Sequence, residues 1–169
     1  MSIIDDLLNR VSDVLNGLQG GEIPRLAVLQ SEGEILDSQK EQLAEGKASS
    51  GHDLRPYYSE DLRARGGWFL SPASAANYSA WKESIGNPYQ AGERNPDAPN
   101  LYINGKFYSE IGVQFGTDSV GIIPKTAFAL EVMSKYGMQS FGLTGERWNG
   151  IMWDNYDKIM DEMKRRLYA

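Results

Sequence analysis

The segment EIGVQFGTDSVGIIP, residues 110–124, decides the fold class of this chain. From Ile111 to Phe115 every second residue is large and apolar, and this period of two is typical of a β-strand. Residues 116–119 (Gly-Thr-Asp-Ser) form a turn, and residues 120–124 read as a returning strand closed by proline. The segment therefore predicts an antiparallel β-hairpin.

Helical periodicity surrounds this hairpin on both sides. Apolar residues spaced three and four apart predict helices at residues 3–18 and 146–167, with a thinner apolar stripe from just after Pro24 to about Glu45. Thr126 is the expected cap of a further helix over residues 127–135. A short helix is expected over residues 75–85, and residues 101–109 are expected to form a helix or turn. Together these elements predict an α+β fold in which long helices pack on a small antiparallel β-sheet.

The length of 169 residues suits one domain with a proper core. Within it we expect a helical N-terminal part (1–65), an extended loop region (66–100), and a part with the hairpin and the C-terminal helices (101–169). No internal repeat or low-complexity tract divides the chain.

The region 66–100 is unusual because it contains four prolines and two tryptophans. A long aromatic loop either folds over its own core or presents a rigid surface to a partner, and both interpretations stay open. Leu29, Leu36 and Leu43, spaced seven apart, similarly indicate either a surface helix or one covered by a neighbouring subunit. The interface candidates are Leu29, Leu36, Leu43, Trp68, Phe69, Tyr78, Trp81 and Tyr89, each with burial inside its own subunit as the alternative.

The sequence offers little catalytic chemistry. It has no cysteine, and its one histidine, His52, lies between Gly51 and Asp53 in an expected solvent-exposed turn. Neither a catalytic triad nor a metal site built on histidine or cysteine can be assembled within one chain. Nucleotide-binding glycine loops and calcium-loop spacings are missing from the sequence. We therefore expect no enzymatic activity, no catalytic or metal-binding residues and no cofactor.

Glutamates near the aromatic loop leave one enzymatic alternative, because two carboxyl groups can hydrolyse a glycosidic bond. The candidates for such a polysaccharide-cleaving or cell-wall-cleaving site are Glu83, Glu93, Glu110 and Glu131. A second alternative is a small monomeric binding module in which the aromatic loop forms a ligand groove.

Charge and hydropathy limit the partners. The net charge is −6, and the basic residues form only short groups, so we expect no specific nucleic-acid binding, although an acidic wall would let DNA slide past in a channel. The acidic start MSIIDDLLNR differs from a secretory signal, and no apolar run has membrane-spanning length, so we expect neither export by that route nor membrane insertion.

Two stretches resemble proteins of tailed bacteriophages. Residues 34–59 are similar to the N-terminal segment of virion-associated proteins from phages of Bacteroidetes-type hosts, and the matching positions are Gln42, Leu43, Gly46, Gly51, Pro56, Tyr58 and Ser59. Residues 100–143 resemble neck and tail-completion proteins of long-tailed phages, at Leu101, Gly105, Phe107, the hairpin, Tyr136-Gly137 and Phe141-Gly142. The sequence departs from that pattern at Asn104, where the family has threonine, and in the length of the 66–100 loop.

The resemblance implies a head–tail joining structural protein without catalytic residues. Such a protein would be made in the cytoplasm of the host bacterium and reside in the virion. It would form a homo-oligomeric ring and contact portal, collar or tail subunits.

Overall fold

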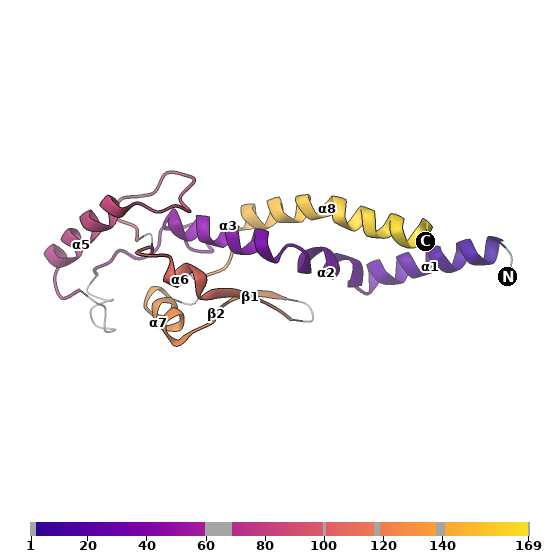
Figure 1. Cartoon of the computed structure of the whole chain (residues 1–169), viewed down its shortest axis with the longest axis horizontal. Helices are drawn as coiled ribbons and strands as arrows, with labels where there is room; N and C mark the ends of the chain where they lie inside the picture. The colour runs from indigo at the N-terminus through magenta and orange to yellow at the C-terminus, as the bar shows by residue number, and fades with distance from the viewer. Residues whose placement is uncertain (1–2, 60–68, 100, 117–118, 138–140, 169) are drawn as a thin grey trace. The chain divides into compact units, whose positions relative to one another are not determined.

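The computed structural model describes residues 3–59, 69–99, 101–116, 119–137 and 141–168 (Figure 1). The elements are α1 (Ile3–Gln19), α2 (Glu22–Leu29), α3 (Glu32–Ala44), α5 (Pro72–Ile85), α6 (Lys106–Ser109), β1 (Ile111–Phe115), β2 (Val120–Pro124), α7 (Ala127–Tyr136) and α8 (Gly145–Tyr168). Helices dominate, and the only sheet among the described residues has two antiparallel strands, which confirms the predicted α+β class.

The chain forms two compact units. Unit 1 comprises Met1–Glu34 together with Trp148–Ala169, and unit 2 comprises Ile35–Arg147. The predicted single-domain organisation, with its parts 1–65, 66–100 and 101–169, stays a prediction.

Unit 1 is built from helices of the two ends of the chain. α1 and α2 are separated at Gly21, whose φ of 71° lies in the left-handed region that favours glycine. Within this unit α8 lies alongside α1 and α2 (Figure 1), and Arg10 Nη1 donates to the backbone oxygen of Leu167 at 3.4 Å. Arg166 of α8 also pairs with Glu22 of α2 at 2.9 Å. Polar contacts thus hold α1 and α2 against the C-terminal part of α8.

Unit 2 contains the main hydrophobic core. Its buried members come from α3, from the segment after it, from α6 and β1, and from α7. They include Leu43, Leu54, Tyr57, Phe107, Tyr108, Ile111, Val132, Met133, Tyr136 and Phe141. Burial raises the pKa of the Tyr108 and Tyr136 hydroxyls well above its usual range, because the phenolate would lose its hydration.

The hairpin forms as predicted. β1 pairs with β2 in the register Ile111↔Pro124, and Phe115 pairs with Val120. The amide of Gly116 donates to the backbone oxygen of Ser119 at 2.8 Å and closes the end of the ladder. Residues 117 and 118 of the predicted turn lie outside the described residues.

Two predicted helix boundaries are wrong. The helix expected from Pro24 to about Glu45 is two helices, because the chain turns between Leu29 and Glu32. The helix expected over 75–85 begins earlier, at Pro72, since Ser71 accepts a hydrogen bond from the amide of Ser74 and caps it. The helix or turn predicted over 101–109 is present as the short helix Lys106–Ser109, which leads into β1. The predicted cap of α7 is confirmed, because Thr126 accepts from the amide of Ala129.

Candidate assembly surface

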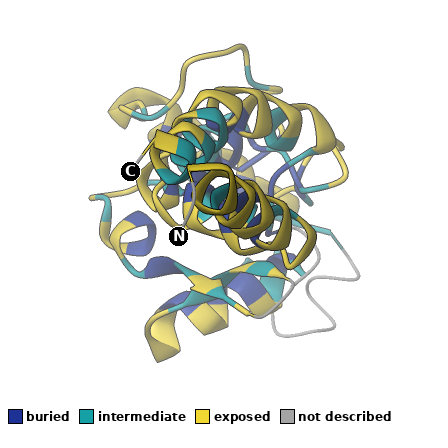
Figure 2. Cartoon of the chain, turned by 90° about the vertical axis from the view of Figure 1, so that its right-hand side faces the viewer, coloured by how far each residue is buried: buried dark blue, intermediate teal, exposed yellow. Residues whose placement is uncertain are grey.

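An apolar stripe on α1 is left uncovered by the rest of unit 1. Ile4, Leu8, Val11 and Leu15 follow one another at intervals of four, three and four residues, which is the spacing of a coiled-coil seam. Their exposed fractions are 70%, 62%, 38% and 50%. Figure 2 shows the helix that begins at the N-terminus as exposed over most of its length. We call these four residues the α1 seam.

Another side of α1 faces α2 and α8. Val14 and Gly17 are buried on this side. A Cβ on Gly17 would lie 3.0 Å from both Arg166 Nη1 and Ile23 Cδ1, so only glycine fits this contact without a shift. The α1 seam therefore lies on a different side from the one that unit 1 uses internally.

Arg166 holds the internal side in place. Its guanidinium lies 2.9 Å from Glu22 and Glu162 and 3.5 Å from Asp13, so it joins α1, α2 and α8. Hydrogen bonds from Arg165 and Arg166 lower the pKa of Glu162 to about 2. The carboxylates of this cluster are thus occupied within unit 1.

A buried polar group also ties the α2–α3 turn to α8. The Ser31 hydroxyl donates to Asn155 Oδ1 at 2.6 Å, and Lys158 Nζ donates to the Ser31 oxygen at 2.7 Å. Lys158 also pairs with Glu34 at 3.0 Å. Since Ser31 and Asn155 are fully buried, their mutual hydrogen bond satisfies groups that water cannot reach.

α8 presents a second apolar group to solvent. Trp153 is 74% exposed, and its ring centroid lies 6.5 Å from that of Tyr156, which is also exposed. Met152 beside them is exposed as well. Unit 1 therefore leaves large apolar side chains exposed on α8 as well as on α1.

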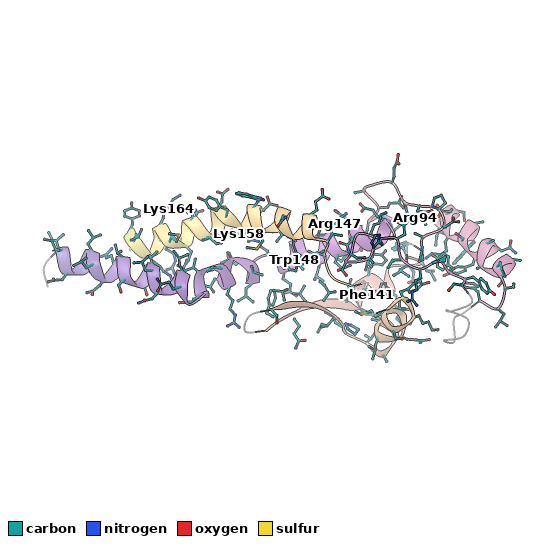
Figure 3. The ribbon with its side chains drawn as sticks, turned by 180° about the vertical axis from the view of Figure 1, so that it is seen from behind. Arg94, Phe141, Arg147, Trp148, Lys158 and Lys164 are labelled. Atoms are coloured by element: carbon teal, nitrogen blue, oxygen red, sulfur yellow. The ribbon has the colours of Figure 1, made fainter. Side chains whose placement is uncertain are left out.

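Unit 2 has a polar cleft of about 600 Å³ lined by Gln42, Glu45, Lys47, Gly51, Thr144, Glu146 and Arg147. Arg147 is labelled in Figure 3, near the start of α8. It is not available to a ligand, because its Nη1 contacts Glu41 at 3.1 Å and its Nη2 contacts Glu45 at 2.9 Å. Gln42 is likewise engaged, since it donates to the backbone oxygen of Gly142 and accepts from the amide of Thr144. Arg147 and Gln42 of this cleft therefore make contacts within unit 2.

The predicted interface residues in the loop region pack largely within unit 2. Phe69 and Tyr78 form ring contacts with Tyr57, at centroid distances of 6.0 and 5.0 Å. Tyr89 stacks on Tyr108 at 5.0 Å. Trp81 is about half exposed, and Trp68 lies outside the described residues.

The predicted leucine stripe is divided between two helices. Leu29 ends α2 and is partly exposed, Leu36 packs against the core of unit 2, and Leu43 is fully buried in that core. A continuous surface heptad through these three leucines is therefore wrong, because the chain turns after Leu29. The use of Leu29, Leu36 and the loop aromatics at an interface stays a prediction.

The four candidate glutamates are dispersed among separate contacts. Glu83 pairs with Arg94, and Glu131 pairs with Lys135 at 3.0 Å. Glu110 accepts a hydrogen bond from Thr126 at 2.6 Å. Glu93 is exposed. Three of the four carboxylates thus have partners within the fold.

His52 is exposed in a turn, as predicted. Within the described ranges of the chain, no three His, Asp or Glu side chains gather in a group that could hold a metal ion. No helix in the described part of the chain combines the length and apolar character needed to cross a bilayer.

The α1 seam was not among the predicted interface residues. The periodicity of residues 3–18 predicts a helix with an apolar face but leaves open what covers that face. The sequence did contain one indication of an exposed apolar face on this helix. The apolar residues at positions 4, 7, 11, 14 and 18 form a second heptad pattern that overlaps the seam. A helix with two seams has more apolar surface than a single neighbouring helix can cover.

Compared with known proteins, the chain matches no family model, and neither a curated protein nor a solved structure matches it.

Proposed function

We propose that this protein is a structural subunit of a tailed-bacteriophage particle, located in the neck or tail, where copies of it assemble into a ring. In this role it joins portal, collar or tail subunits and performs no catalysis. It is made in the host cytoplasm and resides in the virion.

The α1 seam is the observation that carries the assembly role. A monomer rarely leaves a continuous row of large apolar side chains in water, because burying such surface lowers the free energy. The seam is also available for a partner, since unit 1 holds α1 through other residues, the buried Val14 beside the seam and Gly17 further round the helix. Trp153 and Tyr156 add a second exposed apolar group, which suits a subunit with more than one neighbour.

The sequence resemblance supports the location in the phage neck or tail. It rests on residues 34–59 and 100–143, which span the glycine turns, the hairpin and the Phe141-Gly142 step. The polar cleft of unit 2 is compatible with a non-catalytic role, since its Arg147 and Gln42 already make contacts within unit 2.

The test compares two neighbouring substitutions in α1. Leu15→Glu places a charge in the seam, whereas Asn16→Glu adds the same charge at an exposed polar position of the same helix. The mass of each protein is measured by light scattering over a concentration series, and the same samples are imaged in negative stain. We expect the unmodified chain and Asn16→Glu to form a closed oligomer, and Leu15→Glu to lose it.

A monomer at every concentration for the unmodified chain would overturn the self-assembling role. It is the result that an enzyme or a monomeric binding module would give. Equal assembly of both variants would mean that the seam does not carry the association.

Detection of the chain in purified phage particles by mass spectrometry tests the location, and its absence from them would contradict a virion protein.

A further inference from the structure

We propose that the α1 seam is covered by the α1 helix of a second copy of this chain, packed antiparallel. This inference rests on the proposed assembly role and names the partner of that surface. It specifies which residues of the two copies meet.

The register follows from the spacing of the seam. In a heptad, Leu8 and Leu15 occupy one core position, and Ile4 and Val11 occupy the other. Antiparallel helices bring these two positions opposite each other. Ile4 of one copy then meets Leu15 of the second, and Leu8 meets Val11. All four exposed seam residues are used, and each copy presents the same surface to the other.

The charges of α1 favour a copy of the same helix. The flanking positions of the seam are Leu7 and Val14 on one side and Asp5, Ser12 and Gln19 on the other, so Asp5 is the one charged residue among them. The charged Asp6, Arg10 and Asp13 lie away from the seam and are engaged inside unit 1: Arg10 lies 2.9 Å from Asp6, and Arg166 lies 3.5 Å from Asp13. In an antiparallel pair the two Asp5 residues lie at opposite ends, so no like charges meet when two copies associate. The remaining neutral flanks offer little by which to select a charged foreign helix.

The acids of the first turn favour the antiparallel direction. Asp5 and Asp6 stand near the N-terminus of α1. Two parallel helices would gather four of these carboxylates at one end, together with two helix N-termini. In the antiparallel register, Asp5 of one copy comes beside Ser12 of the second, and the helix dipoles oppose each other favourably.

The size of the seam predicts a weak pair. From Ile4 to Leu15 the helix rises about 16 Å, so the contact lies at the low end of interface sizes. We expect a dimer with a dissociation constant of roughly micromolar order. In a symmetric antiparallel pair each copy uses its α1 seam once, so the pair cannot add further copies through that surface. A ring would therefore be built from dimers that meet through another surface. The exposed Trp153 and Tyr156 of α8 are available for that contact.

The absence of cysteine from the sequence permits a clean cross-linking test. Ile4→Cys and Leu15→Cys are made as separate proteins, one of them carrying a size tag. We expect mild oxidation of the mixture to give a disulfide between the two variants, because their Cα atoms come within disulfide reach. Either variant alone should give none, because equal positions lie about 16 Å apart along the antiparallel pair.

The matched control places the cysteines on the polar side of the same helix. Asn9→Cys and Asn16→Cys, alone or mixed, should stay reduced because neither faces the seam. Disulfides within each single seam variant would reveal a parallel pair and overturn the proposal. Failure of the mixed seam variants to cross-link would overturn it as well.

The outcome also separates this inference from the proposed function. If light scattering shows a large oligomer while the seam cysteines stay reduced, assembly stands and the α1 pair is wrong. If the mixed disulfide forms while the unmodified chain never exceeds a dimer, the α1 pair stands and the ring is wrong.

Discussion

Lys82 is a lysine that the fold almost removes from water. It lies in α5 with 2% of its surface exposed, and its Nζ is 6.0 Å from the centre of the Tyr78 ring. Burial, and to a lesser extent the nearby Arg94 guanidinium, lowers the pKa of Lys82 from its ordinary value of 10.5 to about 8. The folded state therefore releases this proton at a lower pH than the unfolded state does.

This difference sets the direction of a pH dependence. Between pH 8 and 10.5 the unfolded chain keeps the Lys82 proton that the folded chain has lost, so the free energy of unfolding rises with pH. We expect Lys82→Met to stabilise the protein at pH 7, because no buried charge is left, and this advantage should shrink toward pH 10. Urea unfolding of Lys82→Met and of the unmodified protein at each pH measures the difference in their free energies of unfolding.

Lys164→Met provides the control for Lys82. Lys164 is exposed on α8, so its substitution should leave the pH dependence unchanged. A constant difference between Lys82→Met and the unmodified protein from pH 7 to pH 10 would contradict the shifted pKa.

The burial of Lys82 shows why some residues escape sequence analysis. A lysine between Trp81 and Glu83 reads as part of a polar helix face, and no local pattern indicates its burial. Its environment is set by Tyr78 on the same helix and by Arg94, which lies twelve residues further along in the loop. Thr126, by contrast, could be predicted as a cap because its hydrogen bond to Ala129 is local.

The same contrast between local and distant contacts holds for whole helices and strands. α1, α7, α8 and the hairpin were predicted because their signals, apolar spacing or a capping residue, lie within each element or directly beside it. The turn between α2 and α3 was not, because Gln30-Ser31 contains no glycine or proline. Ser31 is instead held by Asn155 and Lys158, which lie more than 120 residues away in the sequence. Tertiary contacts of this kind carry no local signal.

Arg147 links the first turn of α8 to α3 within unit 2. It reaches Glu41 and Glu45, and its Nη1 also donates to the backbone oxygen of Ser38 at 3.2 Å. We expect Arg147→Met to lower the free energy of unfolding by about 1–2 kcal/mol, since two carboxylates lose a charged hydrogen-bond donor that is only partly screened by water.

The comparison for Arg147 uses the other end of the same helix. Lys164 pairs with Asp161 at 3.4 Å on the exposed surface, so Lys164→Met should change stability by less than about 0.5 kcal/mol. Chemical denaturation of both variants at pH 7 and moderate salt measures the difference. If the two substitutions cost the same, Arg147 does not fasten α8 to α3.

The location of the buried apolar surface distinguishes the two units at the scale of the whole molecule. The residues of the main core cluster lie between Leu43 and Phe141 and thus all belong to unit 2, whereas α1 of unit 1 buries only Val14 and Gly17. The sequence predicted an apolar face on α1 but not its exposure, because exposure depends on every other segment of the chain. Self-association would bury the exposed side chains of the α1 seam.

Hydrogen exchange measured by mass spectrometry tests this division in the intact chain. Amides of α7 should exchange slowly at every protein concentration, because Val132, Met133 and Tyr136 are buried in the core of unit 2. Amides of α1 should exchange fast in dilute protein and slow down as the concentration rises, because the proposed second copy would cover the α1 seam and stabilise the helix. Leu15→Glu should abolish the concentration dependence in α1 and leave α7 unchanged. The contrary result would be α1 exchange that does not depend on concentration in a sample whose mass shows oligomers. It would mean that the assembly forms through another surface and leaves the α1 seam exposed to solvent.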